Sequence, residues 1–124
     1  MTEQDLKHRI ETDLENLRLP IDEVEICIRP YSKSYYGRYF PVNDKNIKAR
    51  IFVYPYPYKK IKLMYSYSAI LCTVIHEMCH LVQFTSSNFV RYRGVMHNPQ
   101  FWKLYNRYVD RALDLCIISR RVDR

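Results

Sequence analysis

The stretch LCTVIHEMCHLVQF, residues 71–84, carries the motif H-E-x-x-H at positions 76–80. Apolar residues occupy nearly all sides of the surrounding segment, residues 65–84, which predicts one helix buried inside the protein. Residues four apart on a helix lie one turn above each other on the same face. The imidazoles of His76 and His80 can therefore reach a single metal ion.

The residue types of this motif fit a catalytic zinc ion. Zinc accepts neutral imidazole nitrogens and keeps three protein ligands plus a water in catalytic sites. Glu77 follows the first ligand and can project toward that water, whose pKa zinc lowers to about 7. We therefore predict that Glu77 is the general base for attack of zinc-bound water on a peptide bond. The competing interpretation is a buried helix with two satisfied histidines, and it requires a costly polar partner for each buried group.

A third zinc ligand must come from elsewhere in the chain. After residue 80, the side chains of suitable type are His97, Asp110, Asp114, Cys116 and Asp123. His97 directly precedes Asn98, a natural N-cap, and Pro99, which suits the first position of a helix. A returning loop can therefore bring His97 beside the motif helix, and we predict it as the third ligand. Asp110, close to the apolar stripe of the last helix, is the best alternative.

The remaining candidates are expected in other environments. Asp114 and Asp123 are predicted to face solvent or lie at the terminus, and His8 to be an ordinary surface residue of the first helix. Apolar residues at spacings of four, three, four and four predict the buried stripe of the last helix: Phe101, Tyr105, Tyr108, Ala112 and Cys116. Cys116 is therefore expected to pack in the core.

The periodicity on either side of the motif predicts an α+β domain. The expected elements are a helix over residues 3–17, strands over 24–28, 35–40 and 49–54, and a last helix from 99. Pro20 stops the first helix, and Gly37 interrupts the second strand. We expect a single domain over residues 1–124, with an N-terminal helix, a small three-stranded mainly antiparallel sheet, the buried motif helix and a C-terminal helix.

The charge of the chain, +7 in total, is unevenly distributed. Residues 1–25 hold eight acidic and three basic side chains, a balance of −5, whereas the rest holds five acidic and seventeen basic ones, a balance of +12. A positively charged surface can bind an anionic partner, most commonly nucleic acid. The alternative is that the charged side chains are simply solvated. Residues 54–60, Tyr-Pro-Tyr-Pro-Tyr-Lys-Lys, form a basic, aromatic loop. Such a loop can stack on single-stranded bases while contacting phosphates, but an ordinary packed connection is the favoured interpretation.

Cysteine usage and hydropathy predict a cytoplasmic protein that does not enter a membrane. The four cysteines form no C-x-x-C pair, and residues 1–5 lack the basic start of a secretory signal. Reduced thiols, packed as small hydrophobic side chains, are therefore expected. No stretch reaches the roughly 18 unbroken apolar residues that are needed to span a bilayer.

Residues 71–84 resemble the active-site helix of the SprT-like zinc metallopeptidases, the family of the DNA-dependent protease Spartan. Residues 97–102, His-Asn-Pro-Gln-Phe-Trp, are similar to its second motif, a histidine followed by Gly-Pro-x-Phe and a helix. The resemblance implies a zincin-like single lobe in which His76, His80 and His97 ligate zinc and Glu77 is the catalytic base. It also implies an N-terminal helix and a small antiparallel sheet before the motif helix.

The chain departs from this family pattern at two points. Asn98 replaces the usual glycine, and no C-terminal C-x-x-C zinc ribbon is present, which bears on the link to DNA more than on the zinc site. A related group with H-E-L-C-H and His-Ser-x-x-Phe-Trp resembles the chain at Phe101 and Trp102, but its histidine motifs lie closer together.

Three hypotheses for the function follow. The first is a zinc metallopeptidase that hydrolyses a protein or peptide substrate, with candidates for the second oxyanion donor at Arg91, Tyr92, Arg93 and Tyr105. The second is a catalytically silent, zinc-stabilised basic module that binds nucleic acid or protein. The third is a nucleic-acid-binding protein whose cleavage is restricted to proteins on that nucleic acid.

Overall fold

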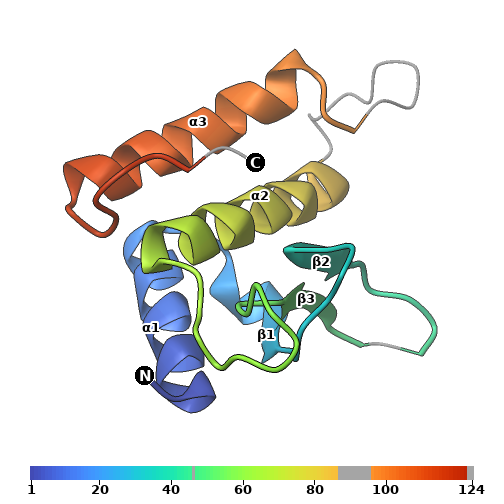
Figure 1. Ribbon diagram of the computed structural model, residues 1–124. Helices are drawn as coiled ribbons and strands as arrows, with labels where there is room; N and C mark the ends of the chain where they lie inside the picture. The colour runs from blue at the N-terminus through green and yellow to red at the C-terminus, as the bar shows by residue number, and fades with distance from the viewer. Residues whose placement is uncertain (46, 87–95, 123–124) are drawn as a thin grey trace.

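The computed structural model of the chain describes residues 1–45, 47–86 and 96–122. Within these ranges the chain forms three α-helices, one short 3₁₀ helix and a three-stranded sheet, so the predicted α+β class is confirmed (Figure 1). The elements are α1 (Glu3–Asn16), η1 (Ile21–Glu23), β1 (Val24–Ile28), β2 (Gly37–Phe40), β3 (Ala49–Val53), α2 (Tyr67–Thr85) and α3 (Pro99–Asp114).

The sheet is mixed, with the strand order β1-β3-β2. β1 pairs with β3 in parallel, with Ile26 opposite Ile51, and β2 pairs with β3 antiparallel, with Tyr39 opposite Ile51. The expectation of a mainly antiparallel sheet is therefore wrong for the β1–β3 pair. The physical reason is that alternation of side chains sets which face of a strand is buried, whereas strand direction depends on how the connections cross the sheet.

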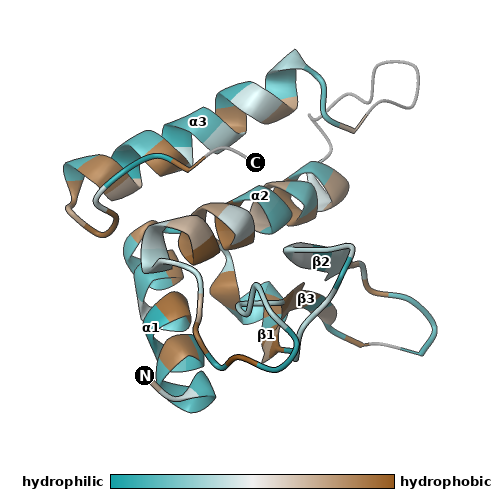
Figure 2. Ribbon diagram, viewed as in Figure 1, coloured by the Kyte–Doolittle hydropathy of each residue, from teal (hydrophilic) through white to brown (hydrophobic). Residues whose placement is uncertain are grey.

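Helix α2 forms the centre of the molecule. It lies between α3 on one side and the sheet on the other, with α1 against β1 (Figure 1). Thirteen of its 19 residues are buried, which confirms the prediction of an internal helix. Hydrophobic residues are concentrated along α2, whereas they alternate with hydrophilic ones along α1 and α3 (Figure 2). A buried central helix holds side chains of the motif rigidly, because every neighbouring element packs against it.

Helix α3 ends at Asp114, two residues before the predicted stripe does. Its buried residues are Phe101, Tyr105, Val109 and Ala112. Cys116 lies beyond the helix, is exposed and has φ 57°, so the expectation that it packs in the core is wrong. Its N–H donates to Leu113 O and the next N–H donates to Ala112 O, at 3.0 and 2.9 Å. This is a Schellman turn, in which a left-handed residue reverses the chain and satisfies the last carbonyls.

Replacing Cys116 with glycine is expected to raise the free energy of unfolding by about 0.5–1 kcal/mol. A left-handed conformation costs a residue with a Cβ roughly 1–2 kcal/mol, and the greater flexibility of glycine in the unfolded chain offsets part of the gain. The measurement is the midpoint of urea denaturation. Leu115→Gly is the control, because Leu115 has φ −84° and gains nothing from glycine, so its midpoint should fall. A lower midpoint for Cys116→Gly would contradict the argument.

None of the helices in the described ranges is both long enough and apolar enough to cross a membrane.

Candidate metal centre

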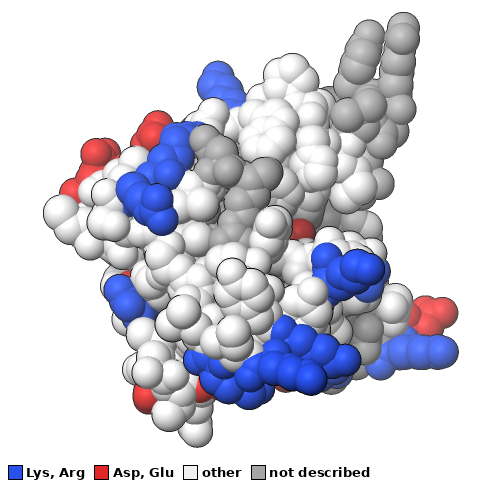
Figure 3. Space-filling view, viewed as in Figure 1, with Lys and Arg blue, Asp and Glu red and all other residues white. Residues whose placement is uncertain are grey.

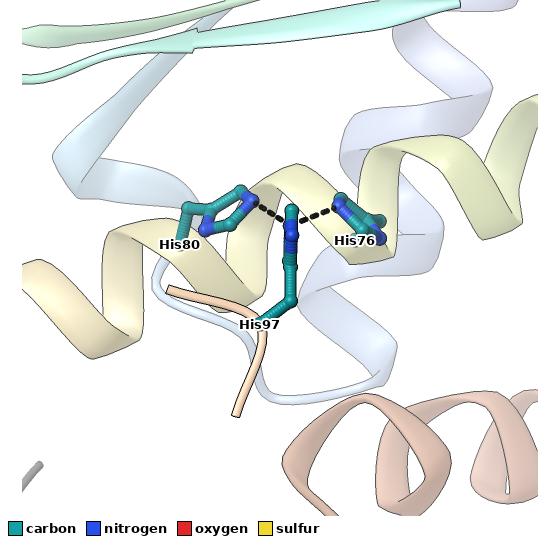
Figure 4. A group of neighbouring side chains, drawn as sticks. All are labelled: His76, His80 and His97. Carbon is teal, nitrogen blue, oxygen red and sulfur yellow. Dashed lines mark hydrogen bonds between the residues drawn. The ribbon is translucent and has the colours of Figure 1, made fainter. Parts of the chain in front are cut away.

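Three histidines converge at the junction of α2 and α3 (Figure 4). His97 Nε2 lies 3.1 Å from His76 Nε2 and 3.0 Å from His80 Nε2. The ligand atoms of all three lie within 4.8 Å of one another. The structure therefore brings together the three residues that the sequence predicted, close enough to bind one metal ion.

The start of α3 holds His97 in this position. The Asn98 side chain accepts a hydrogen bond from the Phe101 N–H at 2.9 Å, which confirms the predicted N-cap. Phe101 is fully buried, and its ring stacks on His80 with centroids 4.7 Å apart. It also meets the His76 ring edge to face at 5.0 Å. One buried aromatic ring thus fixes both the α2–α3 contact and the planes of two imidazoles.

Gln83 connects His80 to the segment that carries His97. Its Oε1 lies 3.3 Å from His80 Nδ1, and its Nε2 donates to Met96 O at 2.6 Å. Accepting the proton of Nδ1 leaves the His80 Nε2 lone pair for a metal, which is the usual role of a partner behind a metal-ligating histidine. No pattern in the sequence around Gln83 indicates this role, because its partner Met96 O lies 13 residues further along the chain.

Substituting Gln83 with leucine is expected to weaken zinc binding by about 10–100-fold. Leucine keeps the bulk but removes both bonds, and partners behind metal ligands typically contribute that much affinity. Competition with a chromogenic chelator measures the change. Thr85→Val is the matched control, since Thr85 also bonds within α2, to Leu81 O at 2.9 Å, but touches no histidine. Equal affinities for the two variants would contradict the role of Gln83.

Glu77 lies beside the histidines in a largely enclosed position. It is 8% exposed, and its Oε2 has no hydrogen-bond partner among the described residues. Burial raises the pKa of Glu77 to about 7, and the positive charge of Arg38 opposes that rise. A carboxylate oxygen that is buried without a protein donor is costly unless a water or cation meets it.

The backbone of β2 packs directly against Glu77. A Cβ added to Gly37 would lie 2.8 Å from Thr73 Cγ2 and 3.3 Å from Glu77 Cγ. The missing side chain at Gly37 therefore lets the strand approach α2 at the position of the motif. Because the backbone of β2 packs against its stem, Glu77 has little freedom to turn away from the histidines.

The donor set fits a zinc ion. Burial, reinforced by His80 and His97, lowers the pKa of His76 to about 4, so that its imidazole is neutral and able to ligate. Three imidazole nitrogens within 4.8 Å of one another, together with the Glu77 Oε2 that has no partner among the described residues, match a cation and its water. The identity of the metal is not fixed by geometry, because imidazole also suits copper, iron and nickel.

The alternative third ligands lie elsewhere. Asp110 is exposed and pairs with Arg121 Nη1 at 3.2 Å, while Asp114 and Cys116 are exposed outside the histidine group. Asp123 lies outside the described residues. His8 is exposed on α1, as predicted. Among the described candidates, only His97 joins the two motif histidines.

A pocket of about 400 Å³ opens beside His76 and Glu77. Tyr105, a predicted oxyanion donor, lines this pocket and is 4% exposed. The other three predicted donors, Arg91, Tyr92 and Arg93, lie outside the described residues. The pocket is of a size that holds small ligands or substrate side chains.

The basic surface is extensive on the side of the sheet. Figure 3 shows Lys and Arg side chains gathered on the lower part of this view, over the sheet and the adjoining loops. In the tyrosine–lysine loop, Tyr56 is buried and donates to Glu3 Oε1 at 3.1 Å, as expected for a packed connection. Tyr58 is 57% exposed next to Lys59 and Lys60, so the outer part of the loop faces solvent.

Comparison of the chain with protein-family models, curated proteins and solved structures finds no match. The geometry and chemistry of the metal centre are therefore the grounds on which a function is proposed.

Proposed function

We propose that the protein is a zinc-dependent metallopeptidase of the SprT-like kind. The observation that carries the proposal is the convergence of His76, His80 and His97 near Glu77, whose buried Oε2 has no partner among the described residues. Two histidines one turn apart, a third from the segment that leads into the following helix and a neighbouring carboxylate make up the donor set of a hydrolytic zinc site. The neighbouring pocket offers space for a substrate.

Each residue has a defined part in the proposed reaction. Zinc, when bound, would activate a water as nucleophile and polarise the carbonyl of the scissile bond. Glu77 takes the proton of the attacking water and then delivers it to the leaving amine. Tyr105, which lines the pocket, is the described candidate for a second donor to the developing oxyanion. Gln83 keeps the His80 ring in the orientation that presents Nε2.

Proteins associated with nucleic acid are the substrate class that we propose. The balance of +12 over residues 26–124 supports it, because such a surface concentrates the enzyme near phosphate backbones. The resemblance of residues 71–84 and 97–102 to the SprT-like motifs supports the same substrate class.

A catalytically silent binding module is the second candidate. The described fold favours it, since the elements of the described residues include no second lobe that would form a far wall for a long substrate cleft. The two candidates differ in the open coordination position that catalysis needs. A hydroxamate that binds the zinc-loaded protein reports such a position.

The deciding experiment is cleavage of a basic DNA-binding protein by zinc-loaded protein, with and without single-stranded DNA. A sample stripped of metal by a chelator and a sample reloaded with zinc run in parallel. We expect cleavage only with zinc, and a stimulation by DNA that declines as salt increases. Cleavage at the same rate with and without DNA would indicate a general zinc peptidase. Absence of cleavage in all conditions would contradict the proposal and favour the binding module.

A further inference from the structure

The pocket beside the metal centre is built from four separate parts of the chain. Its lining among the described residues comprises Ser34, Tyr35, Tyr36 and Gly37 before and within β2; Cys72, Thr73, His76 and Glu77 on α2; Trp102, Tyr105 and Asn106 on α3; and Arg121 and Val122 after it. Cys72 and Thr73 lie one helical turn before His76 and Glu77. The pocket therefore extends from the metal centre along α2, toward the N-terminus of that helix.

The segment that follows α3 also lines the pocket. Ile118 is 4% exposed, and the Ser119 N–H donates to Ser68 Oγ at 3.1 Å, which ties this segment to the start of α2. Arg121 and Val122 then line the pocket beside Asn106. A pocket of about 400 Å³ has room for one large side chain.

The lining presents aromatic surface with little unopposed charge. Arg121 and Glu77 are the only Arg, Lys, Asp or Glu among the described lining residues. The Arg121 guanidinium bonds Asp110 Oδ1 at 3.2 Å and also Asn106 Oδ1, so its charge is opposed. Trp102 and Tyr105 meet edge to face, with centroids 5.5 Å apart.

Several of these rings are more exposed than large aromatic side chains usually are. Tyr35, Tyr36 and Trp102 are 45%, 48% and 40% exposed around the same opening. Exposed aromatic rings that gather around a cavity are typical of a ligand-binding surface. Rings of this kind favour an apolar or aromatic guest, which they can meet edge to face.

We propose that this pocket is the specificity subsite of the enzyme and binds an aromatic or long aliphatic side chain next to the scissile bond. The proposal rests on the proposed peptidase function and adds the substrate preference. A peptide bond held beside Glu77 places a flanking side chain about one turn along α2, above Cys72 and Thr73. Phe, Tyr, Leu and Met fit the mostly uncharged lining, whereas Asp, Glu, Lys and Arg would lose hydration beside a lining whose one arginine is already paired.

The first test compares hydrolysis of a peptide series that differs at one residue beside the cleaved bond. We expect kcat/KM for Phe, Tyr, Leu and Met to exceed that for Ala, Asp and Lys by roughly 10–100-fold, the usual gain from burying a large apolar side chain. Equal kcat/KM across the series, with cleavage intact, would overturn the subsite while leaving the peptidase function in place.

A pocket-filling variant tests the location. Asn106→Trp adds a bulky ring to the α3 wall and should bring kcat/KM for the Phe peptide down to that for the Ala peptide. Arg107→Trp is the matched control, because it adds the same ring at the next, exposed position of α3, which is not part of the lining. It should keep the preference. Loss of preference in both variants, or in neither, would contradict the assignment; thermal melting confirms that both fold.

A binding measurement separates the subsite from catalysis. Acetohydroxamate and 3-phenylpropanohydroxamate chelate the same metal but differ in the side chain that they offer to the pocket. By calorimetry with zinc-loaded Glu77→Gln protein, we expect the phenyl compound to bind roughly 10–100-fold more tightly, and Asn106→Trp to remove the difference. A phenyl preference without any peptide cleavage would support the subsite and reject the peptidase. Equal Kd values without cleavage would reject both.

Discussion

Replacing Glu77 with glutamine is expected to lower kcat for peptide hydrolysis by roughly 10²–10⁴-fold, while the protein retains one zinc per chain. Glutamine has the shape of glutamate but cannot accept the proton of the attacking water. None of the three predicted metal ligands is altered. The fold should also tolerate the change, because Glu77 Oε2 makes no hydrogen bond to a described residue that glutamine would break.

The measurement pairs peptide kinetics with zinc content determined by elemental analysis. Glu25→Gln serves as the control, since Glu25 is an exposed carboxylate of β1 whose nearest cation is Arg50 at 3.8 Å. Its kcat should equal that of the wild type. Turnover retained by Glu77→Gln would remove Glu77 from the proposed reaction, and loss of zinc from that variant would make it a ligand.

Replacing His97 with alanine is expected to weaken zinc binding by more than about 100-fold. Loss of a hydrogen-bond partner of a metal ligand already lowers metal affinity by about 10–100-fold. His97 itself supplies one of the three nitrogens, so its loss should have a larger effect. Two histidines on one helical turn, His76 and His80, would remain and hold zinc only weakly. Peptide hydrolysis should be lost together with the metal.

Competition against a chromogenic chelator measures this affinity, with two comparison variants. His8→Ala removes an exposed histidine of α1 and should leave the zinc Kd unchanged. Asp110→Ala removes the alternative third ligand and should also leave it unchanged, because Asp110 is exposed and bonds Arg121. A large loss of affinity in Asp110→Ala, with none in His97→Ala, would reverse the assignment of the third ligand.

The parts of the fold that depend on local periodicity could be predicted from the sequence. The buried helix, its two histidines and the N-cap at Asn98 each follow from residues close together in the chain. The three strands were also located, with bounds that differ by one or two residues at some ends. Strand direction could not be predicted, because it depends on how distant segments cross the sheet.

The three clustered histidines could be predicted more fully than the residues around them. His97 could be identified because few suitable side chains follow His80 and because Asn98 and Pro99 mark a helix start. The contacts of Gln83 and the close approach of Gly37 depend on long-range packing, and no local pattern reports them. The same holds for the pocket, whose walls come from segments far apart in the chain.

The error at Cys116 has a local cause. The apolar spacing of α3 continues through residue 116, but the helix ends at Asp114 and the next turn is left-handed. Glycine usually marks such a turn, and here a cysteine occupies it. Because no glycine marks this helix end, the sequence does not show where α3 stops. The apolar periodicity alone therefore predicts a helix that is too long.

The strand order β1-β3-β2 has a consequence for the timing of assembly. β1 and β2 are not neighbours in the sheet, and each forms its ladder only with β3. During synthesis, the nascent chain therefore has no partner for either outer strand until Ala49–Val53 has emerged from the ribosome. All three clustered histidines follow that point in the chain. The candidate metal centre is consequently completed only after the sheet has all its strands, and α3 closes over it last.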